Sequence, residues 1–218
     1  MKRWVRPMAW LLGLVLLLAS WAPAPALAAP TQEAVLAGGC FWCLEHDLEV
    51  LAGVLDAQSG YSGGSLENPT YGQVSAGGTG HQEVVLVKFD TARISYGDLL
   101  RAYWRNIDPL DGGGQFCDRG SSYSPVIFVK GDQQRSQAQA SLRAAAAELR
   151  RPAEALKVQI KPLKRFWPAE NYHQDYAERN KVKYNYYRWA CGRDRRLDSV
   201  WGSRARSGRA WIVPTAKT

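Results

Sequence analysis

Two cysteines separated by two residues lie near the start of the chain, in surroundings that favour a reactive thiol. The apolar run at 33–37 predicts a strand, and two glycines connect it to Cys40. From Phe41 to about residue 51 the apolar residues follow helical spacing, so we expect Cys40 at a helix N-terminus. Unpaired N–H groups and the helix dipole lower the pKa of a thiol there. We therefore predict that Cys40 is a nucleophile; the alternative is a small buried hydrophobe, the usual role of a lone cysteine.

The spacing of Cys40 and Cys43 has other interpretations. Covalent haem attachment requires a histidine directly after the second cysteine, and Leu44 stands there. A structural zinc site needs a second such pair or a histidine pair, and the three histidines, at 46, 81 and 173, are too far apart in sequence. We therefore expect no metal. A thiol–disulfide oxidoreductase that uses both cysteines on protein substrates is the main alternative.

Three further residues are ambiguous when each is taken singly. Glu83 precedes the β-branched run at 84–89, which predicts a strand, and a charge at a strand entrance is often only solvated. Tyr71 and Tyr123 stand in turn-rich segments, where an aromatic side chain is more often a loop residue. The three residues indicate a function only when they are considered together with Cys40.

Six segments of the chain resemble the A-type peptide-methionine sulfoxide reductases and occur in that family's order. They span most of the chain, roughly from residue 35 to residue 190. Each segment alone is a modest match, but six in one order are specific. The segments are Gly39-Cys40-Phe41-Trp42, Ser59-Gly60-Tyr61-Ser62-Gly63-Gly64, Asn68-Pro69-Thr70-Tyr71, Gly80-His81-Gln82-Glu83-Val84-Val85, Asp118 with Gly120 before Tyr123, and Ala169-Glu170-Asn171-Tyr172-His173-Gln174.

The resemblance implies a chemistry centred on Cys40, whose thiolate would attack the sulfur of methionine sulfoxide. It implies that Glu83 protonates the sulfoxide oxygen and that Tyr71 and Tyr123 donate hydrogen bonds to it. A carboxylic acid among apolar walls has a raised pKa and can be neutral near pH 7, as a general acid requires. Methionine then leaves, and the nucleophile is left as a sulfenic acid.

The resemblance also implies how substrate is held and how the enzyme is regenerated. Phe41 and Trp42 would form the pocket for the ε-methyl group, and Asp118 would lie near the substrate backbone. The implied substrate is the S epimer of methionine sulfoxide, free or in proteins, and the implied reductant is a thioredoxin-like dithiol, with no bound cofactor. Two other classes of protein are alternatives to such a reductase: a non-catalytic binding module with an aromatic pocket, and a cysteine–histidine hydrolase.

The thiol that resolves the sulfenic acid is left open, because the sequence departs here from the commonest family pattern. Position 43 is usually glycine and is cysteine in this chain, and the familiar tail with paired cysteines is absent. Ser124 and Pro125 also stand where the family often has Arg-Ser. Cys43, Cys117 and Cys191 are all candidates. Pairing by elimination suggests Cys40 and Cys43 as the redox couple and Cys117–Cys191 as a structural disulfide.

Periodicity along the chain predicts an α+β fold. The expected order is β-α-β, a loop, β-α-β, then a helix and an irregular C-terminal tail. This order predicts a ferredoxin-like two-layer sandwich with a mixed, mostly antiparallel sheet. The expected strands are 33–37, 54–61, 84–89, 126–129 and 156–163, and the expected helices are 41–51, 95–106, 132–151 and 170–179.

Both ends of the chain differ in composition from its middle. Three basic residues, an apolar run at 8–21 and Ala26-Leu27-Ala28 are typical of a secretory signal peptide over 1–28, with an uncleaved anchor as the alternative. We expect a catalytic domain at 29–192, a basic, partly irregular tail at 193–218, and a periplasmic or secreted monomer. Residues 29–192 carry 18 basic and 18 acidic residues, so no nucleic-acid partner is expected.

Overall fold

Predicted strands form the centre of a six-stranded sheet in the computed structural model, which describes residue 1, residues 30–209 and residue 211. The order across the sheet is β7-β6-β1-β3-β2-β8. β1 pairs antiparallel with β3 and β6, and β2 pairs antiparallel with β3. The strands are β1 (Thr31–Ala37), β2 (Val54–Ser62), β3 (Gln82–Asp90), β6 (Val126–Val129), β7 (Gln159–Pro162) and β8 (Phe166–Pro168).

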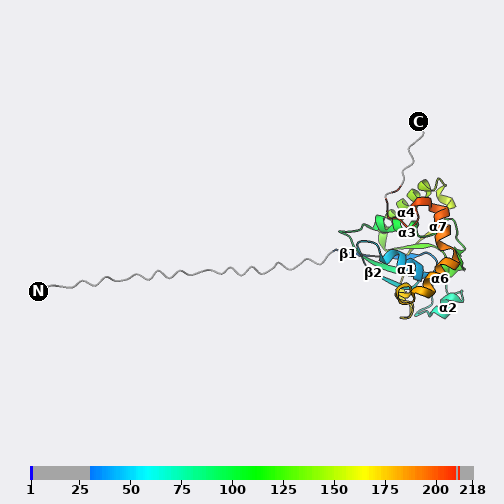
Figure 1. Ribbon diagram of the computed structural model, residues 1–218, viewed down its shortest axis with the longest axis horizontal. Coiled ribbons are helices and arrows are strands. Elements are labelled where there is room, and N and C mark those ends of the chain that lie inside the picture. Colours follow the sequence, from blue (N-terminus) through cyan, green and yellow to red (C-terminus); the bar gives the residue numbers. More distant parts are fainter. Residues whose placement is uncertain (2–29, 210, 212–218) are drawn as a thin grey trace, which may run out of the picture.

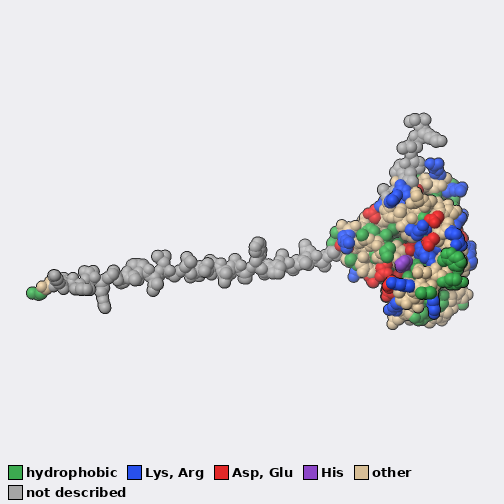
Figure 2. All heavy atoms as spheres, viewed as in Figure 1, with side chains coloured by type: hydrophobic (Ala, Val, Ile, Leu, Met, Phe, Trp, Pro, Cys, Tyr) green, Lys and Arg blue, Asp and Glu red, His purple; other side chains and the backbone are tan. Residues whose placement is uncertain are grey.

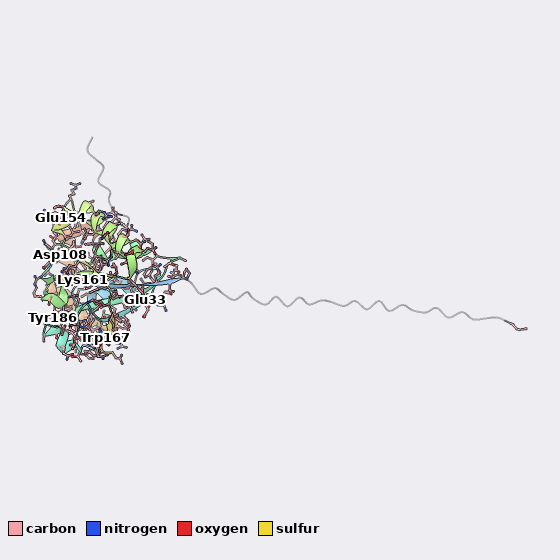
Figure 3. All side chains as sticks on the ribbon, turned by 180° about the vertical axis from the view of Figure 1, so that it is seen from behind. Glu33, Asp108, Glu154, Lys161, Trp167 and Tyr186 are labelled. Carbon is pink, nitrogen blue, oxygen red and sulfur yellow. A yellow bond between two sulfur atoms is a disulfide. The ribbon has the colours of Figure 1, made fainter. Side chains whose placement is uncertain are left out.

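The connections between the central strands are those of a ferredoxin-like fold. α1 (Phe41–Glu49) joins β1 to β2, and α3 (Tyr96–Trp104) lies between β3 and β6 in the chain. Two β-α-β units are therefore interleaved as β6-β1-β3-β2, which confirms the predicted fold class. β7 adds to one edge in parallel and β8 to the other in antiparallel pairing, so the sheet is mixed and mostly antiparallel. Lys161 on β7, Glu33 on β1 and Trp167 on β8 follow this order in Figure 3.

Later helices pack against the two helices of the β-α-β units, α5 against α1 and α4 against α3. Figure 1 shows α6 beside α1, and α7 beside α3 and α4. Asp118 lies on a small two-stranded ribbon, β4 paired with β5, in the long connection before β6. These elements are α2 (Tyr71–Ser75), α4 (Gly131–Glu148), α5 (Tyr176–Arg179), α6 (Lys181–Cys191), α7 (Arg193–Trp201), β4 (Gly114–Gln115) and β5 (Asp118–Arg119).

The core follows the alternation of side chains along the central strands. Leu36 and Val85 lie in the main apolar cluster, together with residues of α1, α3 and α7. Val35 and Val84, one position away on each strand, lie in a second cluster that Phe166 covers. Both faces of the central strands are therefore buried, which explains the nearly continuous apolar runs of the sequence.

The segment after residue 156 differs from the prediction. The expected strand at 156–163 is shorter, Gln159–Pro162, and Leu156 belongs to the main core instead. The expected helix at 170–179 is reduced to Tyr176–Arg179, because turns occupy 171–175 and Asp175 adopts a left-handed backbone with φ 52°. A left-handed residue interrupts an α-helix, so the helix begins only after Asp175.

The expectation of an irregular tail from Arg193 is wrong for residues 193–201, which form α7. Leu197 and Trp201 of this helix lie in the main core, and the Trp201 indole donates to the carbonyl of Ile107 at 2.9 Å. The arginines around them obscured an apolar pair at helical spacing, and the fold continues past residue 192. The predicted signal peptide lies outside the described residues. Among the described residues, no helix is long and apolar enough to span a membrane.

Candidate active site

Cys40 lies where the chain turns from β1 into α1. It occupies the N-cap position, and its carbonyl accepts hydrogen bonds from Cys43 N at 3.2 Å and Leu44 N at 3.3 Å. Gly39 has φ 84°, and a Cβ at that position would lie 2.6 Å from the Cβ of Gln115, so only glycine fits this turn. The tight turn leaves Cys40 6% exposed, in reach of a small pocket.

The structure brings the predicted reacting residues together around that pocket, which has a volume of about 80 Å³. Residues from β3, α2 and the loops before β6 meet the first turn of α1 here. All seven residues predicted for catalysis and substrate binding contribute to the wall, and Tyr187 is an eighth that the sequence did not suggest. The lining residues are Cys40, Phe41, Trp42, Tyr71, Glu83, Asp118, Tyr123 and Tyr187.

Glu83 is buried at the start of β3, with 3% of its surface exposed. Its Oε2 accepts a hydrogen bond from the backbone N–H of Phe41 at 3.0 Å, so the carboxyl caps the first turn of α1. Burial raises the pKa of Glu83 to about 8, and the Phe41 hydrogen bond opposes part of that rise. The carboxyl is therefore mostly neutral near pH 7 and can donate a proton.

The two tyrosines reach the pocket from short helical turns. Tyr71 is the first residue of α2, and its N–H donates to Glu170 Oε1 at 2.9 Å. Thr70 and Gln73 form a reciprocal capping box, a local signal from which this helix could have been predicted. Burial, followed by the charge of Glu83, raises the pKa of both Tyr71 and Tyr123. Both hydroxyls therefore stay protonated and can donate hydrogen bonds.

Trp42 is held in position by the segment after β8. Its indole N–H donates to His173 Nδ1 at 3.0 Å, and its ring stacks on Tyr176 at a centroid distance of 3.6 Å. Burial lowers the pKa of His173, so a neutral imidazole can accept this bond. His173 and Tyr176 therefore fix one apolar wall without lining the pocket.

Asp118 is tied to α6. Its Oδ2 accepts a hydrogen bond from the Tyr187 hydroxyl at 2.5 Å, and burial raises the pKa of the Asp118 carboxyl. Tyr187 also meets the Trp42 ring edge-on at 6.1 Å. Because Tyr187 precedes Cys191 by four residues on one helix, it lies on the same helix face as that cysteine.

One disulfide is present among the described residues, and it joins the two cysteines that elimination suggested as a structural pair. Cys117 and Cys191 form a disulfide, with Cα atoms 5.0 Å apart, that ties the β4–β5 ribbon to the end of α6. Cys40 and Cys43 are free and buried. The two free thiols share a hydrogen bond along the first turn of α1.

The prediction that the pKa of Cys40 is lowered is wrong. Burial raises its pKa, and the hydrogen bond with Cys43 and the negative charges around it, including Glu83, raise it further. The pKa of Cys43 is lowered instead, chiefly because it accepts the hydrogen bond from Cys40. Local position at a helix start did not account for this burial or for the carboxyl groups that the fold brings close. Cys43 is therefore the thiol of the pair that loses its proton first, with Cys40 as the hydrogen-bond donor.

A buried thiol pair, a neutral carboxylic acid and two tyrosine hydroxyls around one small pocket define a thiol-dependent oxidoreductase. A family model described as peptide methionine sulfoxide reductase matches residues 32–205. The chain belongs to the peptide methionine sulfoxide reductase family, and the prediction of an oxidoreductase of this family is confirmed.

Individual relatives agree with the family model. The chain is 54% identical over 182 residues to peptide methionine sulfoxide reductase MsrA 2 of Caulobacter vibrioides, with 83% of this chain and 91% of that protein covered. Methionine sulfoxide reductase A of Corynebacterium diphtheriae superposes with a TM-score of 0.65 at 28% identity, covering 70% of this chain and 76% of that one. Reduced Mxr1 of Saccharomyces cerevisiae gives a TM-score of 0.65 at 26% identity, covering 69% and 86%.

Proposed function

We propose that this chain reduces the S epimer of methionine sulfoxide, free and in proteins, with Cys40 as the nucleophile. The observation that supports the proposal is the meeting of Cys40, Glu83 and the two tyrosines around a pocket of about 80 Å³. Phe41 and Trp42 give that pocket an apolar wall suited to the methyl group of the substrate, and Asp118 lies at its rim. The test is consumption of methionine S-sulfoxide compared with reduction of insulin disulfides. Reduction of insulin alone would favour the alternative, a thiol–disulfide oxidoreductase.

In the first step, the Cys40 sulfur attacks the sulfoxide sulfur. Its proton passes to the Cys43 thiolate, to which it is already hydrogen-bonded. Neutral Glu83 gives its proton to the sulfoxide oxygen while Tyr71 and Tyr123 donate hydrogen bonds to it. Transfer of that hydroxyl to the Cys40 sulfur breaks the sulfur–oxygen bond of the substrate. Methionine leaves reduced, Cys40 is oxidised to a sulfenic acid, and Glu83 is left as a carboxylate.

In the second step, Cys43 resolves the sulfenic acid. Cys43 follows Cys40 by three positions, on one face of a helical turn, so the two sulfurs can bond with little movement of the chain. Cys191 is already paired with Cys117, whose disulfide closes a span of 74 residues and serves as a structural link. A thioredoxin-like dithiol then reduces the Cys40–Cys43 disulfide and is itself oxidised. No bound cofactor takes part, and the enzyme acts as a monomer.

The resolving role gives opposite expectations for two serine variants. Cys43→Ser should release one methionine per enzyme and then stall as a sulfenic acid, detected by mass spectrometry. Cys191→Ser should continue to cycle but unfold more easily, since a disulfide across such a span stabilises by about 4 kcal/mol. The converse turnover result would give the resolving role to Cys191. If both variants cycle with thioredoxin, Cys43 is not required.

We also propose that the protein is exported and that its signal peptide is removed after Ala28. The support is the arrangement of Lys2, Arg3 and Arg6, an apolar run and a small-residue site. N-terminal sequencing of the protein from the periplasm or medium of an expressing bacterium should begin at Ala29. A protein that stays in the membrane fraction with Met1 intact would show an uncleaved anchor instead.

A further inference from the structure

One buried and two partly buried charged residues lie against or on α1, the helix that carries the thiol pair, and the mechanism above does not use them. Arg193 is the first residue of α7 and is 1% exposed. Arg188 comes from α6, and Asp47 comes from α1, one turn after Cys43. Both arginines belong to the aromatic and basic segment that the sequence did not connect with catalysis.

Arg193 forms an ion pair with Asp47, and it shares this carboxylate with Arg188. Its Nη2 donates to the carbonyl of Asn106 at 2.6 Å, and its Nη1 lies 3.5 Å from the carbonyl of Gly38, two residues before Cys40. The guanidinium lies over the Phe116 ring at 4.5 Å. Its Nε makes no hydrogen bond and is 3.6 Å from Asp47 Oδ2. Carbonyl and ring contacts orient a cation but leave its charge in place.

Asp47 is hydrogen-bonded to Arg188 and lies farther from Arg193. Its Oδ1 accepts from Arg188 Nη1 at 2.8 Å, whereas its Oδ2 accepts no hydrogen bond. Arg188 also pairs with Asp194, whose side chain is 48% exposed and therefore screened. Two guanidinium groups therefore share one largely buried carboxylate. Because a buried cation that is only partly paired is costly, a further negative group nearby is favoured.

We propose that Arg193, assisted by Arg188, holds Cys43 as the thiolate that resolves the sulfenic acid of Cys40. This inference rests on the proposed function, in which Cys43 is the resolving thiol. Arg193 acts through Cys43 and is therefore a positioning residue. It explains why the start of a helix in the basic C-terminal segment is buried beside the active site.

The direction of each charge supports this role. Arg193 and Arg188 lower the pKa of Cys43, whereas Asp47 and burial raise it. These two positive charges come from the C-terminal helices, Arg188 from α6 and Arg193 from α7. The charged and titratable groups that face the thiol pair include Asp47, Tyr71, Glu83, Asp118, Tyr123, Tyr184, Tyr187, Arg188 and Arg193.

The step that Arg193 promotes is balanced without an added reactant. The Cys43 sulfur attacks the Cys40 sulfur, the Cys40–oxygen bond breaks, and the hydroxide that leaves takes up the proton given up by Cys43 to form water. Cys43 is oxidised and the sulfenic sulfur is reduced, so both end as a disulfide. A lower pKa of Cys43 increases the fraction that is ready to attack.

The first test is a pH titration of Cys43 alone. In the Cys40→Ser variant the serine hydroxyl can still donate a hydrogen bond to Cys43. The thiolate absorbance that this variant shows, and that the double variant Cys40→Ser/Cys43→Ser lacks, belongs to Cys43. Adding Arg193→Met should raise the midpoint by about one pH unit, as expected for loss of a nearby charge. Arg193→Lys keeps the positive charge and should return the midpoint most of the way to its original value. Asp47→Asn should shift the midpoint in the opposite direction, although it too removes a buried contact.

Arg195→Met, an exposed arginine on the same helix, is the matched control and should leave the midpoint in place. The inference is overturned if Arg193→Met does not move the midpoint, or if Arg193→Met and Asp47→Asn move it the same way, since lost packing alone would do that. If Arg193→Met does not fold, the Cys43 titration midpoints of Arg193→Lys and Asp47→Asn are compared instead. A midpoint lowered in Asp47→Asn and nearly unchanged in Arg193→Lys supports the inference, and a midpoint raised in Asp47→Asn overturns it.

The second test follows resolution in protein that keeps Cys40. After mixing with methionine sulfoxide without reductant, Arg193→Met at pH 7 should close the Cys40–Cys43 disulfide about tenfold more slowly, in proportion to the lost thiolate. Raising the pH by one unit should recover the rate. If Cys43→Ser cycles normally, the resolving role of Cys43 is refuted, and the midpoint titration still tests whether Arg193 lowers the pKa of Cys43. If Cys43→Ser stalls but Arg193→Met leaves the midpoint unchanged, the role of Arg193 is refuted and the resolving role of Cys43 stands.

Discussion

Replacing Cys40 with serine is expected to abolish reduction of methionine S-sulfoxide. A serine hydroxyl stays protonated and is a far weaker nucleophile than a thiol, and it cannot form the sulfenic acid through which the oxygen leaves. The loss should exceed about 10⁴-fold, the scale on which enzymes lose activity with their nucleophile. Methionine formation, measured in the presence of a dithiol reductant so that resolution is not limiting, checks the result.

Cys43→Ser is the matched control, because it makes the same change three residues away in the same buried turn. It should retain a first turnover, slowed because the Cys40 proton loses its acceptor, whereas Cys40→Ser should give none. A thermal unfolding midpoint close to that of the unaltered protein in Cys40→Ser would show that the loss is chemical. Residual activity within tenfold of the unaltered enzyme would remove Cys40 from the nucleophilic role.

The fold and the reacting residues could be predicted because their sequence signals are local. Once the strands are assigned, few arrangements of the sheet are possible. Two glycines between a strand and a helix mark the turn that carries Cys40. β3 runs antiparallel to β1, with Val85 opposite Leu36, so the start of β3 must meet the end of β1. Glu83 therefore reaches the first turn of α1, although 42 residues separate it from Phe41.

The contribution of α6 and α7 could not be predicted in the same way. The residues of α6 that face inward are Tyr184, Tyr187, Arg188 and Cys191, so helical spacing produces no aliphatic stripe for a periodicity argument to detect. Arg193 looks like one basic residue among several in the sequence. Its burial depends on the docking of α7 against the core, which only the tertiary structure reveals.

The raised pKa of Cys40 illustrates the same limit for chemistry. The sequence placed Cys40 at a helix start, and that placement is correct. Burial and the nearby negative groups outweigh the effect of the helix end. A neutral Glu83 and a Cys40 that donates a hydrogen bond to Cys43 are two consequences of one buried site. The proposed mechanism needs both, because Glu83 gives a proton to the substrate while Cys40 gives one to Cys43.

Glu83→Ala is expected to slow the first chemical step by about 10²–10⁴-fold, the usual contribution of a general acid. Glu83→Gln is the matched variant, because its amide oxygen can still accept from Phe41 N while its NH₂ group donates to the sulfoxide oxygen. It should keep an intermediate rate, since a hydrogen bond remains but no proton is transferred. Single-turnover release of methionine, free of the resolution step, is the measurement. An unchanged rate in Glu83→Ala would remove Glu83 from the mechanism.

The pH dependence of the same step should carry the signature of Glu83. The carboxyl is active in its neutral form and has a pKa of about 8, so its contribution is present below that pH and is lost as pH rises through it. Deprotonation of the thiols raises the rate with pH in both the unaltered enzyme and Glu83→Gln. The ratio of the unaltered rate to the Glu83→Gln rate therefore isolates the contribution of the Glu83 proton. That ratio should be constant at pH 6 and fall about tenfold for each unit above about 8. Because folding favours the neutral carboxyl, the unaltered protein should also lose stability relative to Glu83→Gln as pH rises toward 8. A rate ratio that stays level from pH 6 to 10 would show that Glu83 donates no proton.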